Sequence, residues 1–190
     1  MSKFVMLSVS PKWCELIANR KKTIEVRKSR PKIATPFKCY IYCTKDRGLT
    51  FYRGRRYCYA DDHSHNAFDV PGNGTIIGKF VCDRISPIYV LDNGSIRYWN
   101  YEHIDQACLS YGDLAAYIGG VGKRGFGWHI SDLKIYDNPR ELREFKKIKR
   151  DCFYADLGLA KRECLDCKNS GCFLERPPQS WCYAEELNDG

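Results

Sequence analysis

The chain has 190 residues, of which 44% are hydrophobic and 14% aromatic, and this length and apolar content suit one ordinary core. Its formal net charge of +8 is concentrated in residues 1–60, which carry 15 Lys/Arg against 3 Asp/Glu. This basic segment either attracts a phosphate-bearing partner or merely aids solubility. No segment approaches the length of a membrane span and no signal peptide is visible, so we expect a cytoplasmic protein without a membrane partner, in which the 11 cysteines are thiols or metal ligands.

Short alternating and helical patterns predict the elements of the first part of the chain. Ser10 followed by Pro11 is typical of a helix start, because serine caps helices and proline suits their first position. The long segment between the third and fourth strands has weak periodicity, which is typical of a functional or mobile loop. The predicted order is strand, helix, strand, strand and insertion, over residues 3–9, 11–20, 23–28, 38–44 and 45–73.

Patterns in the second part of the chain predict a strand, two helices, a further strand and a third helix. Gly119 and Gly120 end the second of these helices, as glycine commonly does. Asn138, with Pro139 after it and Glu141 three residues later, has the pattern of a helix start. The predicted ranges are 75–82 (running on toward Ile88), 101–108, 110–118, 125–136 and 138–149.

The predicted strand over residues 23–28 places charged side chains on one face. Ile24 and Val26 share the other face, so Thr23, Glu25 and Arg27 point together in the opposite direction. A carboxylate and a guanidinium side by side, after the basic pair Lys21 and Lys22, suit a polar ligand such as a nucleotide. The alternative is a solvated strand face with a weak surface ion pair.

The residues from Leu7 to Pro31 resemble the opening of the ASCH domains, which are small domains with the PUA-like fold. Three further segments, residues 74–80, 111–118 and 127–131, resemble later family elements, and residues 176–183 resemble a tail of phage and gut-bacterial members. Residues 19–21 occupy the stretch where the family usually has a glycine.

The resemblance implies that Lys22, Thr23, Glu25 and Arg27 line a ligand cleft, with Lys22 and Arg27 on phosphate and Glu25 on a base edge. One branch of these folds hydrolyses N4-acetylcytidine and carries a lysine and, three residues later, a threonine. Here Lys22 matches the lysine but Glu25 stands in place of the threonine, so we expect no efficient deacetylation. Lys22 and Glu25 remain the candidate catalytic pair if the protein is an enzyme, which the sequence leaves uncertain.

Trp128 and His129 face opposite ways on their predicted strand, so only one of them can line the cleft. Trp128 is the candidate for stacking on a base. The alternative places Trp128 in the core, because tryptophan is usually largely buried.

Five of the 11 cysteines lie within residues 152–182. Cys164 and Cys167 have a spacing that can hold two thiolates on one tetrahedral metal. We therefore hypothesise a structural zinc on Cys164, Cys167, Cys172 and Cys152, with Cys182 as the alternative fourth ligand. The competing interpretation is that these are packed thiols in a cysteine-rich chain.

The sequence thus predicts an α+β protein: a small PUA-like β-barrel with flanking helices over residues 1–150, which include the 45–73 insertion, and a cysteine-rich C-terminal extension over 151–190. The preferred function is binding RNA or a nucleotide in a basic cleft. The alternatives are a hydrolase acting on a modified nucleoside or RNA, and a protein-interaction module with a protein partner.

Overall fold

The computed structural model describes residues 4–52, 58–59, 71–93, 95–97, 99, 101–147 and 173–186. Its helical elements are α1 (Pro11–Ala18), α2 (Tyr101–Ala107), α3 (Tyr111–Ile118) and the short 3-10 helix η1 (Leu142–Glu144). Its strands are β1 (Phe4–Val9), β2 (Ile24–Arg27), β3 (Phe37–Cys43), β4 (Leu49–Thr50), β5 (Cys58–Tyr59), β6 (Ile76–Val90), β7 (Ile96–Arg97), β8 (Arg124–Arg140), β9 (Phe145–Lys147) and β10 (Trp181–Glu186). Within the described part of the chain no helix is long and apolar enough to cross a membrane.

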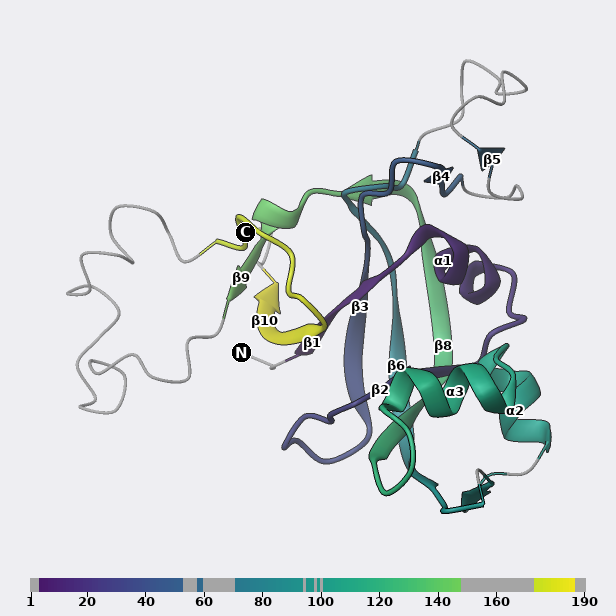
Figure 1. Ribbon diagram of the computed structural model, residues 1–190. Coiled ribbons are helices and arrows are strands. Elements are labelled where there is room, and N and C mark those ends of the chain that lie inside the picture. The colour runs from purple at the N-terminus through teal and green to yellow at the C-terminus, as the bar shows by residue number, and fades with distance from the viewer. Residues whose placement is uncertain are drawn as a thin grey trace, which may run out of the picture.

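One mixed sheet dominates the fold, with strands in the order β2-β8-β6-β3-β1-β10-β9 and β7 paired to β6 (Figure 1). The pair β1–β3 is parallel and the other pairs are antiparallel. The α+β class is confirmed. The strand pairings among the described residues form an open path from β2 to β9, so they do not show the closed ring of the predicted barrel.

Two apolar clusters lie on opposite faces of β2. The larger cluster fills the inner face of the curled sheet and includes Leu7, Ile41, Phe80 and Trp128. The second cluster packs α2 and α3 against Ile24 and Val26 of β2 and against the far end of β6. Both faces of β2 are therefore buried, and the alternation of this strand sends its charged side chains toward the inner face of the sheet.

Local signals explain the helices. Pro11 occupies the first turn of α1 as predicted, although the Ser10 side chain makes no capping hydrogen bond. After α1 the chain passes through Arg20 with a φ of 57°, a left-handed conformation, within the stretch where ASCH domains usually have glycine. Ser110 caps α3 by accepting a hydrogen bond from the Asp113 backbone, and Gly119 ends it with a φ of 115°.

The helix predicted over residues 138–149 is wrong. β8 continues to Arg140, which pairs with Ile76 of β6, and the chain then forms η1 and β9. A reciprocal capping box does occur, but it joins Glu141 and Glu144. Tertiary packing overrides the local pattern here, because the fully buried Phe145 contacts the rings of Phe4 and Tyr40.

The C-terminal strand belongs to the main sheet. β10 lies between β1 and β9, with Leu7 opposite Trp181 and Phe4 opposite Ala184. This part of the predicted 151–190 extension therefore packs with the core. In the predicted insertion, β4 and β5 form a two-stranded sheet, while residues 53–57 and 60–70 lie outside the described residues.

Candidate functional site

The side chains of Lys22, Glu25 and Arg27 form one buried ionic cluster. Glu25 forms ion pairs with both cations: its Oε1 lies 2.9 Å from Arg27 Nη2 and its Oε2 lies 3.5 Å from Lys22 Nζ. The three residues are only 3%, 6% and 6% exposed. The structure thus brings together the three charged residues that the resemblance places in one cleft, but it buries them: one carboxylate lies between two cations, and none of the three is presented to solvent.

Lys22 is positioned by the turn between α1 and β2. Its ammonium donates to the backbone oxygen of Ala107 at 2.6 Å, and it lies 4.9 Å from the centroid of the Trp13 ring. Burial lowers the pKa of Lys22 from its usual 10.5, and the nearby Glu25 carboxylate opposes this shift. The position of Lys22 depends on packing against α2, because Ala107 is the last residue of that helix.

Arg27 connects β2 to strands with which it does not pair. Its Nη2 donates to the Ser8 backbone oxygen at 2.7 Å, and its Nη1 lies 3.3 Å from both the backbone and the side-chain oxygen of Ser180. These bonds join β2 to the end of β1 and the residue before β10. Among the described residues, the buried Nε of Arg27 has no hydrogen-bond partner. Arg27 therefore holds the curled sheet together through its side chain.

Two of the expected cleft residues, Thr23 and Trp128, lie elsewhere than the sequence predicts. Thr23 is half-buried, and its backbone donates to Gln106 and accepts from Ile130. Trp128 is fully buried in the core, where its ring lies edge-on to Phe37 at 5.8 Å between centroids. Its ring is not available for stacking on a base in this structure, which matches the alternative interpretation of Trp128 as a core residue. His129, on the other face of β8, pairs with Asp83 at 2.6 Å.

A groove with basic walls begins where β2 ends, and sequence reasoning missed it. It has a volume of about 860 Å³ and is lined by residues 28–34 with Arg124 and Phe126 from the start of β8. Among the described residues, its lining contains Lys28, Arg30, Lys32 and Arg124 and no acidic residue. The signal in the sequence is the run of basic residues directly after the strand, interrupted by Ser29 and Pro31.

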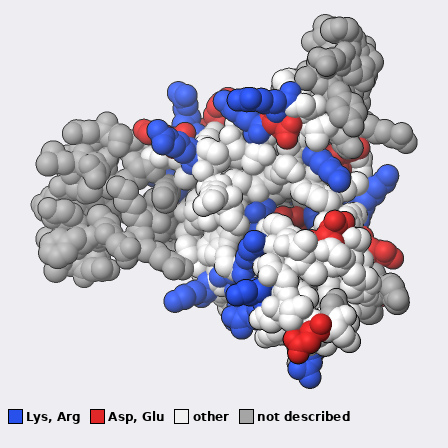
Figure 2. Space-filling model, in the orientation of Figure 1, with Lys and Arg blue, Asp and Glu red and all other residues white. Residues whose placement is uncertain are grey.

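Contacts with rings and with β10 hold the walls of this groove. The guanidinium carbons of Arg124 and Arg30 lie 5.1 and 5.8 Å from the centroid of the Phe126 ring. Trp181 donates its indole N–H to Ser29 Oγ at 3.0 Å, and the Lys32 backbone donates to the Tyr183 hydroxyl at 2.7 Å. The space-filling view shows Lys and Arg side chains gathered beside α3 on this face (Figure 2). The groove is therefore preorganised although residues 28–34 lie outside any helix or strand.

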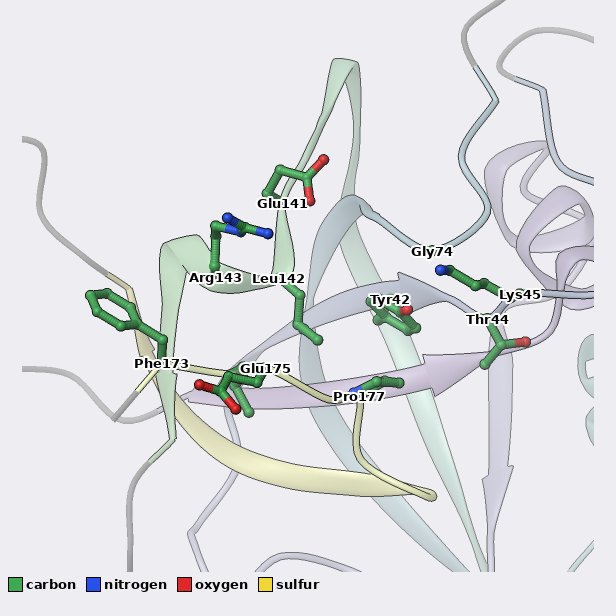
Figure 3. A pocket seen from close by; sticks show the side chains of 11 residues that line it. Tyr42, Thr44, Lys45, Gly74, Glu141, Leu142, Arg143, Phe173, Glu175 and Pro177 are labelled. Carbon is green, nitrogen blue, oxygen red and sulfur yellow. The ribbon is translucent and has the colours of Figure 1, made fainter. Parts of the chain in front are cut away.

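A second groove, of about 1080 Å³, has mixed chemistry (Figure 3). Its lining includes Lys45 and Arg143 but also Glu141 and Glu175, together with apolar side chains such as Phe173. Positive and negative side chains are equal in number among the described residues that line it, so this lining gives no preference for a polyanion.

The described residues contain no group of three or more His, Cys, Asp or Glu that could hold a metal ion. Of the hypothesised zinc ligands only Cys182 is described, and it lies partly buried in β10 opposite Met6. Cys152, Cys164, Cys167 and Cys172 lie outside the described residues, so the zinc hypothesis stays a prediction.

Replacement of Lys22 by Met should change how stability depends on pH. The folded pKa of Lys22 lies below 10.5, so between the two values the unfolded chain binds more protons, and stability rises with pH across that window. Below the window Lys22 is charged in both states and its burial penalty is fully present. In urea unfolding from neutral pH upward, the difference in unfolding free energy should move in favour of the wild type as pH approaches 10.5.

The control for this measurement is Lys21→Met, which removes the charge of an exposed neighbour. Its difference from the wild type should stay nearly constant over the same range. A Lys22→Met difference that is also constant, or that moves toward the variant, would contradict the lowered pKa.

Comparisons with known proteins identify structural neighbours. The sequence matches no family model and no curated protein. Two crystal structures of mutants of ZmASCH from Zymomonas mobilis match with TM-scores of 0.53 and 0.50, each at 17% identity over 97% of this chain. The match covers 88% and 90% of those chains, respectively. At this level of identity the likeness concerns the fold.

Proposed function

Because the chain has the fold of the ASCH domain structures, we propose that it binds RNA or a nucleotide through the groove lined by residues 28–34, Arg124 and Phe126. The observation that carries this proposal is the lining of that groove, which in the described part of the chain has four cationic side chains and no acidic one. Such a lining concentrates positive potential where a phosphate can reach it. The second groove lacks this property because its two cations face two carboxylates.

The chemistry of the groove favours phosphate groups. Arginine can donate two parallel hydrogen bonds to a phosphate, and lysine supplies a compact charge. Arg30 and Arg124 lie against the Phe126 ring, which limits their freedom before any ligand arrives. Less conformational entropy is then lost on binding.

The buried cluster of Lys22, Glu25 and Arg27 holds the strand end from which the groove wall begins. Arg27 is the last residue of β2 and Lys28 is the first residue of the groove wall. The bonds from Arg27 to Ser8 and Ser180 fix the end of β2, and thereby the direction in which residues 28–34 leave the sheet. In this proposal Lys22, Glu25 and Arg27 position the groove, and Lys28, Arg30, Lys32 and Arg124 contact phosphate.

The hydrolase hypothesis stays a prediction without a supporting contact. The Lys22 amine already donates to Ala107 and lies beside Glu25, and it is 3% exposed. A catalytic role would require this cluster to open to a substrate.

Binding of a single-stranded RNA oligonucleotide should depend steeply on salt. If four cations each neutralise one phosphate, the affinity should fall roughly 50-fold between 50 and 200 mM monovalent salt, from a slope of about −0.7 per phosphate. Fluorescence anisotropy with a labelled oligonucleotide measures this slope. Failure to bind at low salt, or an affinity indifferent to salt, would reject the proposed function.

A further inference from the structure

The last turn of α3 carries an exposed aromatic side chain beside the basic groove. Tyr117 is 41% exposed, whereas Leu114 and Ile118 of the same helix are buried against the second apolar cluster. A single exposed tyrosine would mean little on its own. Here Lys28, the first cation of the groove, lies over the Tyr117 ring with Nζ 5.4 Å from the centroid.

Close packing of the Ile118 side chain against Gly125 places the neighbouring Tyr117 at the groove. A Cβ atom added to Gly125 would lie 2.9 Å from the Ile118 side chain and 3.4 Å from the Arg27 backbone oxygen. The end of α3 therefore sits directly over the junction of β8 and β2. Lys28 follows Arg27 and Arg124 precedes Gly125, so the residues that flank this junction are the groove cations themselves.

We propose that Tyr117 stacks on a base of the bound strand, so that the groove takes single-stranded nucleic acid, with phosphates on Lys28, Arg30, Lys32 and Arg124. This inference rests on the proposed function and deepens it. Surfaces that bind single strands commonly combine cations along the path of the sugar-phosphate backbone with an exposed aromatic ring. The ring selects single strands because only unpaired bases offer a face for stacking.

The environment of Tyr117 suits this role. Partial burial raises the pKa of its hydroxyl from the usual 10, against the opposing effect of Arg27, and this shift further favours the neutral phenol. An ionised phenolate would repel the phosphates that the groove attracts. The Phe126 ring cannot replace Tyr117, because it is 8% exposed and lies under the two guanidinium groups.

The chain offers a matched control at Phe173. This ring is 39% exposed and has Lys146 Nζ 5.9 Å from its centroid, but it lines the second groove. Tyr117→Ala and Phe173→Ala therefore remove similar exposed rings, each beside a lysine. Neither ring fills the core, so both variants should fold with thermal midpoints close to that of the wild type.

The test measures binding of three probes: a single-stranded RNA, an abasic strand of the same length, and the same RNA as a duplex. Tyr117→Ala should weaken single-stranded RNA binding roughly 5- to 150-fold, which is the range for loss of one stacked base. It should leave the abasic strand unchanged, and Tyr117→Trp should restore the RNA affinity. Phe173→Ala should bind all three probes like the wild type, and the wild type should prefer the single strand to the duplex.

The outcomes separate this inference from the proposed function. Base stacking is wrong if the wild type binds the RNA and Tyr117→Ala binds it equally well. It is also wrong if Tyr117→Ala lowers the affinity for the abasic strand as much as the affinity for the RNA. In both cases phosphate binding stands. Duplex RNA bound more tightly than the single strand also overturns the inference. If the wild type binds none of the three probes, the proposed function itself fails.

Discussion

Glu25→Gln is expected to lower the free energy of unfolding by about 3–5 kcal/mol, the usual cost of removing one partner from a buried ion pair. Glu25 is the one carboxylate that contacts both Lys22 and Arg27 within this cluster. Without its charge, two cations that are 3% and 6% exposed would remain buried beside each other. Since a domain of this size loses roughly 2–4 °C per kcal/mol, the thermal midpoint should fall by about 6–20 °C.

The control for Glu25→Gln is Asp83→Asn, which breaks the pair with His129. That pair is as short as 2.6 Å, but its side chains are 45% and 27% exposed. Solvent screens such pairs, so this change should cost about 1 kcal/mol or less. Calorimetry of both variants decides the matter, and a Glu25→Gln protein as stable as Asp83→Asn would show that the cluster is not a desolvated ionic unit.

Removing the groove cations should abolish most of the affinity for RNA. The triple variant Lys28→Ala, Arg30→Ala, Lys32→Ala leaves Arg124 as the remaining cation of the lining. Its affinity should fall only about 3-fold between 50 and 200 mM salt, because one phosphate contact remains. If both proteins converge near 1 M salt, the loss at 50 mM is roughly 500-fold.

A second triple variant controls for net charge. Lys38→Ala, Lys45→Ala and Lys134→Ala remove the same charge from exposed positions outside the groove, and Lys45 lines the second groove. This variant should keep nearly the wild-type salt slope, because it removes long-range attraction but no direct contact. Equal losses in the two triple variants would mean that RNA binds by overall charge rather than in the groove.

Several features of this protein follow from short-range patterns in its sequence. The alternation over residues 24–27 predicts which side chains of β2 share a face, and that division is observed. Pro11 and Gly119 predict a helix start and a helix end, because each restricts or permits particular backbone angles wherever it stands. The α+β class is likewise predicted correctly.

Tertiary structure decides what surrounds those faces. The pattern over residues 138–149 predicts a helix, yet β8 continues because β6 lies alongside and Phe145 has a place in the core. The sequence around Trp128 is compatible with a binding site and with a core position, and the packing of the main apolar cluster around its ring decides for the core.

The charged face of β2 shows the same division most clearly. Its spacing determines that Glu25 and Arg27 lie together, but not that they are buried, because the Arg27 side chain bonds to Ser180, which lies 153 residues away. The groove also joins distant segments, residues 28–34 and the start of β8. Backbone angles and side-chain alternation are properties of neighbouring residues and can be read along the chain. Burial, ion pairing and grooves depend on which distant segments meet, and only the folded sheet brings those segments together.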